Sequence, residues 1–245
     1  MHLKTKEADA FVDAWGSSNS NLFITQPCEN IGTESFVRRL ARKHLSYHPN
    51  GRDEYESYLE LRYPAGDERE LQLFYASPSV HCKFYNQFIG TFVIDISLLV
   101  KDQYSNDLNR LLEYIKQNNQ QIRYILVATG SDREALQFLY GTIRFAVQLI
   151  EQVSIDVPPG SQFAEWISQQ RALQLTDSCR KELAMVFQDL SDLPGFQGYK
   201  TAAAFAHVLQ REHSFTVQAV RDTANRLSAT LLNTPHIQKK RIGFE

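Results

Sequence analysis

The chain has little of what marks disulfide-rich, zinc-binding, secreted or membrane-spanning proteins. Its three cysteines are an odd number at wide spacing (Cys28, Cys82 and Cys179), which fits neither a disulfide framework nor a zinc site. No run approaches the roughly 18 apolar residues that span a bilayer. The charged N-terminal stretch also lacks the apolar segment of a signal peptide. These absences predict a cytoplasmic protein that has no membrane span and keeps its thiols reduced.

The chain also lacks a strong excess of charge of either sign. Its 26 lysines and arginines nearly balance 28 aspartates and glutamates, so the net charge of -2 creates no basic field that would attract nucleic acid. The seven histidines are scattered and form no metal-ligand pattern with cysteine or carboxylate residues. We therefore expect neither a nucleic-acid partner nor a bound metal. With 43% hydrophobic residues, the composition is that of an ordinary globular protein.

Apolar periodicity predicts alternating strands and helices over the first two thirds of the chain. A short amphipathic helix is expected around Ala8–Trp15, before a polar linker. The elements expected after it are a strand at 22–25, a helix from Glu34, a β-hairpin of Tyr58–Tyr63 and Glu70–Tyr75, a strand at Ile89–Ser97, a helix at Ser105–Lys116, a strand at Arg123–Ala128, a helix at Arg133–Gln152 and a strand at Ser154–Val157. This order predicts a three-layer α/β fold with a mostly parallel sheet and one antiparallel edge hairpin.

The remainder of the chain is helical throughout in its pattern. Apolar residues at helical spacing predict helices at residues 163–173, 177–190, 201–213 and 215–232. The second is stopped by Pro194 and Gly195, and the fourth ends before Pro235. We therefore divide the sequence into an N-terminal helix and linker (1–20), an α/β domain (21–160) and a C-terminal helical extension (161–245).

The stretch from Asn21 to Arg42 has the outline of the strand, tight loop and helix that bind phosphate in P-loop NTPases, GxxxxGK[ST]. Gly32 matches the second glycine, but Pro27 stands at the first, Thr33 at the lysine and Glu34 at the Mg²⁺-binding hydroxyl. Thr33 offers no positive charge to a phosphate. The carboxylate of Glu34, at the helix N-terminus, competes with phosphate for the same N–H donors. Pro27 lacks a backbone donor and restricts φ where glycine normally stands.

Residues 21–157 resemble the small (Ras-like) GTPase branch of the P-loop NTPases in element order and spacing. The hairpin resembles the one that ends in the family's DxxG motif, with Tyr75 in place of the aspartate and Pro78 in place of the glycine. The strand 123–128 resembles the one that ends in NKxD, where Thr129 replaces the asparagine and Asp132 is kept. Asp132 is also well placed as a helix cap, which is the interpretation we favour.

Three altered loops together imply a pseudo-GTPase that is not an enzyme, has no catalytic residue and binds no cofactor. The function expected from this resemblance is that of a protein-binding scaffold or adaptor subunit whose partners are other protein subunits. The candidate binding residues are aromatic side chains of the expected hairpin, which also offers a strand edge for pairing. They are Tyr58, Tyr63, Phe74 and Tyr75.

Two other functions remain open. In an ATPase of the AAA-like P-loop branch with a divergent nucleotide site, Asp95 would be the Walker-B acid and Thr129 or Ser131 the polar sensor. The C-terminal helices would then form a lid. Ile96 stands where such strands usually place a catalytic glutamate, which counts against this alternative, as does the missing lysine. An unrelated enzyme that uses His81, Cys82 or Asp95 is the third alternative, although adjacent positions in sequence do not by themselves make a catalytic pair.

Overall fold

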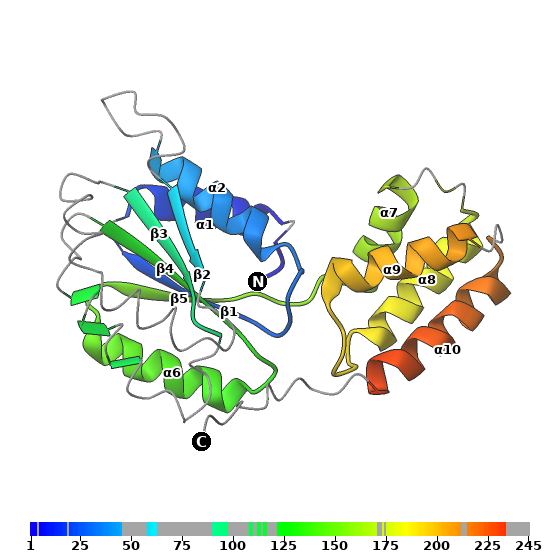
Figure 1. Cartoon of the computed structure of the whole chain (residues 1–245). Coiled ribbons are helices and arrows are strands. Elements are labelled where there is room, and N and C mark those ends of the chain that lie inside the picture. Colours follow the sequence, from blue (N-terminus) through cyan, green and yellow to red (C-terminus); the bar gives the residue numbers. More distant parts are fainter. Residues whose placement is uncertain are drawn as a thin grey trace, which may run out of the picture. The chain divides into compact units, whose positions relative to one another are not determined.

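The computed structural model describes residues 1–3, 5–18, 20–45, 58–62, 90–97, 108–109, 112–113, 115–116, 122–170, 173, 175–211 and 215–233. The chain divides into two compact units (Figure 1). The sheet unit consists of Met1–Pro27 and Thr33–Asp156, and the helical unit of Cys28–Gly32 and Val157–Glu245. The N-terminal helix is thus part of the sheet unit, and a short loop after the first strand belongs to the helical unit.

The sheet unit is built on five strands that all pair in parallel, in the order β2-β3-β4-β1-β5. The strands are β1 (Asn21–Gln26), β2 (Tyr58–Arg62), β3 (Gly90–Asp95), β4 (Ile122–Thr129) and β5 (Ile150–Ser154). Every residue of β1 is buried, as expected for an apolar strand with a neighbour on each side. Because the strands are parallel, their carboxyl ends lie along one edge of the sheet, which we call the carboxyl edge.

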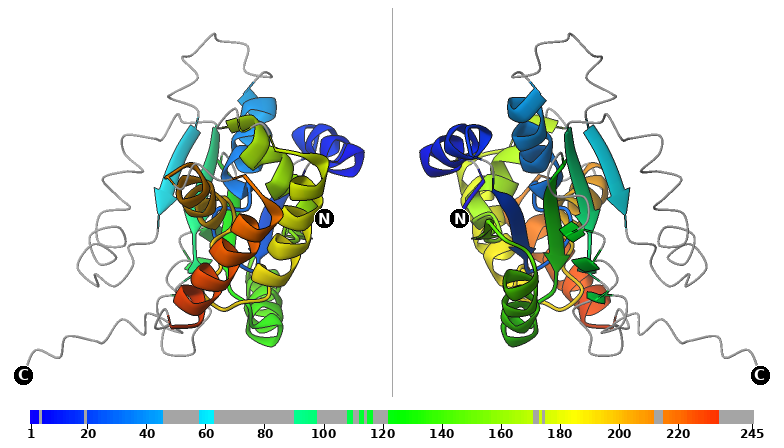
Figure 2. Two further views of the ribbon diagram at one scale, coloured as in Figure 1. Left: turned by 90° about the vertical axis from the view of Figure 1, so that its right-hand side faces the viewer. Right: turned by 90° about the vertical axis from the view of Figure 1, so that its left-hand side faces the viewer.

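Helices cover both faces of this sheet. Helices α1 (Lys6–Gly16) and α2 (Thr33–Leu45) lie on one face and α6 (Arg133–Ala146) on the other, as Figure 2 shows. The ring of Phe23 in β1 stacks on Tyr140 of α6, with 5.6 Å between centroids, while Phe36 of α2 packs against Phe11 of α1. The predicted three-layer α/β architecture is therefore confirmed.

The expected antiparallel hairpin is not seen in the part of the chain that the structure describes. Its first segment, β2, pairs in parallel with β3, in a register that places Leu59 opposite Phe92. The second segment, Glu70–Tyr75, lies outside the described residues. Residues 108–109, 112–113 and 115–116 of the expected helix Ser105–Lys116 are helical.

The helix predicted for Arg133–Gln152 is wrong in its last turns. It ends at Ala146, because Val147 is extended and Leu149 has a left-handed φ of 51°. The chain then enters β5, so the last strand begins earlier than the predicted Ser154. The backbone of β5 pairs with β1 in a register that places Ile150 opposite Asn21. This long-range pairing overrides the local sequence pattern.

Arg123 of β4 ties the N-terminal helix to the sheet. Its guanidinium lies 3.4 Å from the centre of the Trp15 ring and donates hydrogen bonds to the carbonyl oxygens of Trp15 and Ser20. Burial lowers the pKa of Arg123 to about 10, an effect that the nearby Glu151 opposes. The group remains cationic at neutral pH, so the contact with Trp15 combines burial with a charge on the ring face.

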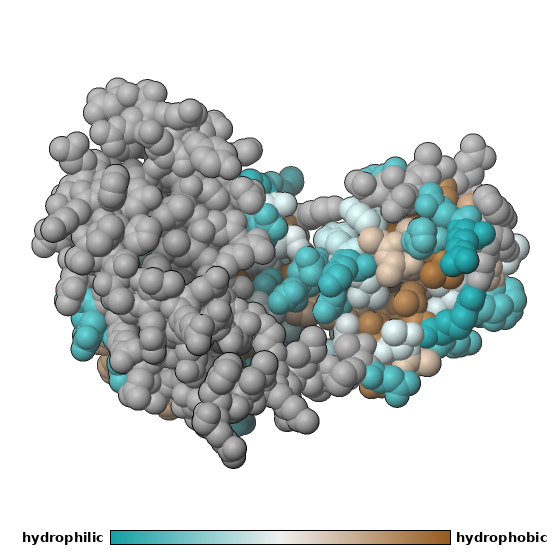
Figure 3. Space-filling view, in the orientation of Figure 1, coloured by the Kyte–Doolittle hydropathy of each residue, from teal (hydrophilic) through white to brown (hydrophobic). Residues whose placement is uncertain are grey.

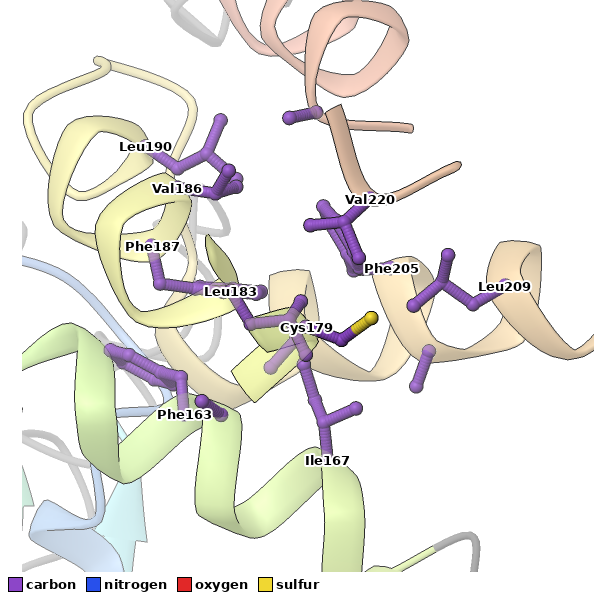
Figure 4. Close-up of a cluster of buried hydrophobic side chains, with 14 of the residues drawn as sticks. Phe163, Ile167, Cys179, Leu183, Val186, Phe187, Leu190, Phe205, Leu209 and Val220 are labelled. Carbon is purple, nitrogen blue, oxygen red and sulfur yellow. The ribbon is translucent and has the colours of Figure 1, made fainter. Parts of the chain in front are cut away.

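The helical unit consists of α7 (Gly160–Gln170), α8 (Asp177–Leu190), α9 (Gly198–Arg211) and α10 (Val217–Asn233). Its core is apolar and rich in phenylalanine: Phe163, Phe187 and Phe205 are fully buried, and the ring of Phe187 lies within 5.2 Å of the other two, centroid to centroid (Figure 4). Apolar and hydrophilic residues are interspersed on the visible surface of this unit (Figure 3). The predicted helical C-terminal segments are thus present, and they form a unit with a core of its own.

Candidate functional site

The loop between β1 and α2 has the conformation that a tight strand-to-helix turn requires. Two of its residues have left-handed backbones, Asn30 with φ 59° and Gly32 with φ 100°. Glycine adopts such a φ without steric cost, and asparagine is one of the few other residues that tolerate it. Asn30 is therefore a sequence signal for this turn, although it stands at a position that the P-loop motif leaves unspecified. The loop ends at Thr33, the first residue of α2.

Polar side chains form a hydrogen-bonded row along the carboxyl edge. Gln26, the last residue of β1, lies opposite Thr129 of β4, and its Nε2 donates to Thr129 Oγ1 over 2.8 Å. The hydroxyl of Thr33 donates to Gln26 Oε1. Ser97, which follows β3, accepts a 3.0 Å bond at its Oγ from the backbone N–H of Thr129. The structure therefore joins the start of α2 to the ends of three adjacent strands.

This row explains what Thr33 does at the position of the missing lysine. Its side chain is buried, with only 5% of the residue exposed, and its hydroxyl hydrogen is used within the protein. Gln26, which is 8% exposed, was not identified in the sequence because it stands before the motif. A polar residue at the carboxyl end of the strand, directly before the turn, is the signal that identifies it.

The other predicted site residues lie at or after the ends of β1, β3 and β4, or in the first turn of α2. Asp95 is the last residue of β3 and lies opposite Val127 of β4. Asp132 is the N-cap of α6, since its Oδ1 accepts hydrogen bonds of 3.0 Å from the N–H groups of Glu134 and Ala135. The predicted capping role is thus confirmed. Glu34 is exposed in the first turn of α2, Pro27 follows β1, and Ser131 is exposed after β4.

Of the site residues predicted at the expected hairpin, only Tyr58 is among the described residues. Tyr58 begins β2, whereas Tyr63, Phe74, Tyr75 and Pro78 lie outside the described residues. His81 and Cys82, the candidates for an unrelated enzyme, lie outside them too. In the described segments, His, Cys, Asp and Glu side chains form no group of three or more that could hold a metal ion. None of the described helices combines the length and the apolar character needed to cross a membrane.

Within the helical unit, the loop segment Cys28–Gly32 is held by the first turn of α9. The N–H of Tyr199 donates to the carbonyl oxygen of Asn30 over 2.8 Å. Gly198 has a left-handed φ of 48°, and a Cβ added there would lie only 2.4 Å from the same oxygen. Burial raises the pKa of the Cys28 thiol to about 11, although a hydrogen bond with the Gly198 backbone lowers it in part. The loop is therefore fixed through its backbone.

Comparison with models of protein families and with curated protein sequences finds no match. Solved structures, in contrast, are similar over most of the chain. The ORC2 protein of Aeropyrum pernix, in ADPNP–ADP complexes, is 15% identical with a TM-score of 0.56, and the match covers 92% of this chain and 68% of that chain. A Walker-type ATPase of Pyrococcus abyssi is 11% identical with a TM-score of 0.52, covering 94% and 73%. Drosophila ORC bound to DNA is 10% identical with a TM-score of 0.55, covering 93% and 61%.

These similarities correct two of the expectations drawn from the sequence. The predicted P-loop NTPase fold is confirmed, but the similar structures are ATPases of the AAA-like branch, so they do not support a Ras-like GTPase or pseudo-GTPase. The prediction that the protein is not an enzyme is wrong, because it rested on that family and the fold is one of ATPases. One of the similar proteins is bound to DNA, so the expected lack of a nucleic-acid partner gains no support. The chain has the fold of AAA-like P-loop ATPases.

Proposed function

We propose that the protein is an ATPase of the AAA-like branch with a divergent nucleotide site. The observation that carries this proposal is the polar row Ser97–Thr129–Gln26–Thr33 along the carboxyl edge, which ends at the start of α2. The backbone that leads into α2 turns through two left-handed residues. Ligands of parallel α/β sheets bind beyond the carboxyl ends of the strands. A helix N-terminus after such a turn presents backbone N–H groups that suit a phosphate.

The residues present fit Mg²⁺ and a nucleoside triphosphate, although Thr33 and Glu34 differ from the usual motif. Asp95 is the last residue of β3, and aspartate is a residue type whose oxygens Mg²⁺ prefers as ligands. Bound Mg²⁺ would neutralise negative charge on the phosphates. The start of α2 offers N–H donors and the neutral Thr33 in place of a lysine, so affinity depends on the backbone more than in an intact P-loop. The exposed Glu34 carboxylate repels the same phosphates.

The test is to measure binding of ATP with Mg²⁺ by calorimetry, together with phosphate release. We expect Asp95→Asn to weaken Mg²⁺-dependent binding about tenfold or more, the loss of one charge-assisted contact. Glu34→Ala should strengthen ATP binding by removing the repulsion. Glu134→Ala, at an exposed first-turn carboxylate of α6, is the matched control and should change nothing. A folded wild-type protein that binds no ATP at millimolar concentration, or an Asp95→Asn variant that binds as the wild type does, contradicts the proposal.

We also propose that α6 gives the protein a role as a subunit of a larger assembly. Its residues Phe138 and Phe145 are 70% and 95% exposed and stand two turns apart on one face, and Leu149, just beyond the helix, is 71% exposed. Residues seven apart lie on one side of a helix. Large exposed apolar groups that gather in this way mark interaction surfaces.

A second copy of the chain is the partner that fits this face best. In an antiparallel pairing centred between Gly141 and Thr142, Phe138 of one copy meets Phe145 of the other, as two-fold symmetry requires. A Cβ at Gly141 would meet no atom within 4 Å, which leaves room for close approach. The Thr142 hydroxyl already donates to the Phe138 carbonyl oxygen over 3.0 Å, so it can be covered without losing a partner.

Light scattering after size-exclusion chromatography tests this second function. We expect wild-type protein to dimerise and the double variant Phe138→Ser, Phe145→Ser to be monomeric. Leu232→Ser, at a 60% exposed position of α10, is the control that should leave the dimer intact. A wild-type protein that is monomeric at about 100 µM, a hundred times a 1 µM dissociation constant, contradicts the pairing. The hairpin residues Tyr58, Tyr63, Phe74 and Tyr75 remain predicted contacts for other protein subunits.

A further inference from the structure

The side-chain amide of Gln26 is the central link of the polar row at the carboxyl edge. Its oxygen accepts from Thr33 and its nitrogen donates to Thr129, while its own backbone carbonyl accepts a 2.9 Å bond from the N–H of Gly130. The side chain is thus held at both ends and the backbone at a third point. A buried amide with this many bonds has a single orientation.

The chemistry of an amide fixes the direction of both hydroxyl bonds. An amide oxygen can only accept and an amide N–H can only donate. The Thr33 hydroxyl therefore donates its hydrogen to Gln26. The Thr129 hydroxyl instead accepts a hydrogen bond from Gln26, and its own hydrogen is not used in that bond. That hydrogen of Thr129 is not given to any residue in the described part of the chain. Of the two threonines, only Thr129 can donate to a ligand.

We propose that Gln26 is a positioning residue that directs the Thr129 hydroxyl to donate to the terminal phosphate of a nucleoside triphosphate. This inference rests on the function proposed above and specifies what the same site distinguishes. A diphosphate lacks the oxygen that Thr129 would contact. Selectivity for ATP over ADP therefore depends on Gln26, although Gln26 itself need not touch the nucleotide.

Two substitutions separate this role from a general role in folding. Gln26→Leu removes both hydrogen bonds, and Gln26→Glu keeps the size but presents two acceptors, which draw the Thr129 hydrogen away from the ligand. We expect both variants to lower the ratio of ATP to ADP affinity about tenfold, since a hydrogen bond to a charged group is the interaction lost. ADP affinity in Gln26→Leu should stay within about twofold of wild type, the range expected when no direct contact changes.

A double-mutant cycle with Thr129→Val gives the decisive readout. If Gln26 acts through Thr129, adding Gln26→Leu to Thr129→Val should leave the ATP to ADP ratio unchanged. Circular dichroism confirms that each variant is folded, and Gln26→Glu stands in if Gln26→Leu is not. An unchanged ratio in either folded single variant, or additive losses in the double variant, overturns the inference alone. A wild-type protein that binds neither nucleotide overturns the proposed function and this inference together.

Discussion

The helical unit and the carboxyl edge of the sheet are each stabilised from within, by different kinds of interaction. Phe163 in the helical unit contacts the rings of Phe187, Phe196 and Tyr199, at 5.2, 5.6 and 4.9 Å between centroids. At the carboxyl edge, by contrast, the side chains that meet are hydroxyls and an amide. Apolar packing is weakened when side-chain volume is removed, whereas a hydrogen bond depends on the direction between its donor and its acceptor. We infer that substitutions in the first region change mainly stability and those in the second mainly ligand selectivity.

The largest expected effect is in the aromatic core of the helical unit. Phe163→Ala leaves a cavity beneath three aromatic rings and should lower the free energy of unfolding by about 3–5 kcal/mol. Urea unfolding followed by the fluorescence of Trp166, which packs on Tyr199, measures the loss. Leu232→Ala, at a 60% exposed site of α10 in the same unit, is the control and should stay within about 0.5 kcal/mol. Equal effects of the two substitutions would erase the contrast between core and surface.

The next effect concerns the contact between α9 and the loop after β1. Gly198→Ala places a Cβ against the Asn30 carbonyl oxygen at a left-handed position, which should cost about 1–3 kcal/mol. Gly141→Ala, in the middle of α6 with open space around it, should instead stabilise the unpaired chain by about 0.5–1 kcal/mol, when both glycine variants are made in the Phe138→Ser, Phe145→Ser background. Thermal unfolding of both variants compares the signs. Stabilisation by Gly198→Ala would mean that the loop is not held as described.

At the carboxyl edge, Asp132 should contribute less. Asp132→Ala removes the cap of α6 and should cost about 1 kcal/mol, whereas Asp132→Asn keeps an acceptor and should cost a few tenths. Chemical unfolding gives both values. If Asp132→Asn is as damaging as Asp132→Ala, the charge rather than the cap is what matters.

Near neutral pH the smallest effect on the folded protein comes from Cys28, because its thiol is not ionised there. Because burial raises its pKa to about 11, alkylation of Cys28 should be slow at neutral pH and rise about tenfold per pH unit up to that value. The unfolded thiol ionises first as pH rises, so Cys28 should also reduce stability between its ordinary pKa and about 11. Peptide mapping by mass spectrometry measures the rate. A plateau below pH 9 would show that the thiol is less buried than described.

The sequence predicted the fold better than the site. The apolar strands and the cap at Asp132 follow from local patterns, and both are present. The lateral order of the strands depends on long-range pairing, so the linear order alone led to the wrong P-loop branch. Gln26 was missed for the same reason, since its partners Thr33 and Thr129 become neighbours only when β1, α2 and β4 assemble.

The contact between Gly198 and Asn30 has a consequence for finding relatives of this chain. A side chain at position 198 would collide with the backbone carbonyl oxygen of residue 30, 168 positions earlier, so the contact favours glycine at 198. The left-handed φ of Asn30 separately restricts the residue types that suit position 30. Position 198 can accept a side chain only if the backbone at residue 30 shifts away from it. Distant relatives should therefore pair glycine at the start of this helix with asparagine, aspartate or glycine in the loop. That pairing is a sequence signature that survives when overall identity has fallen too low to detect.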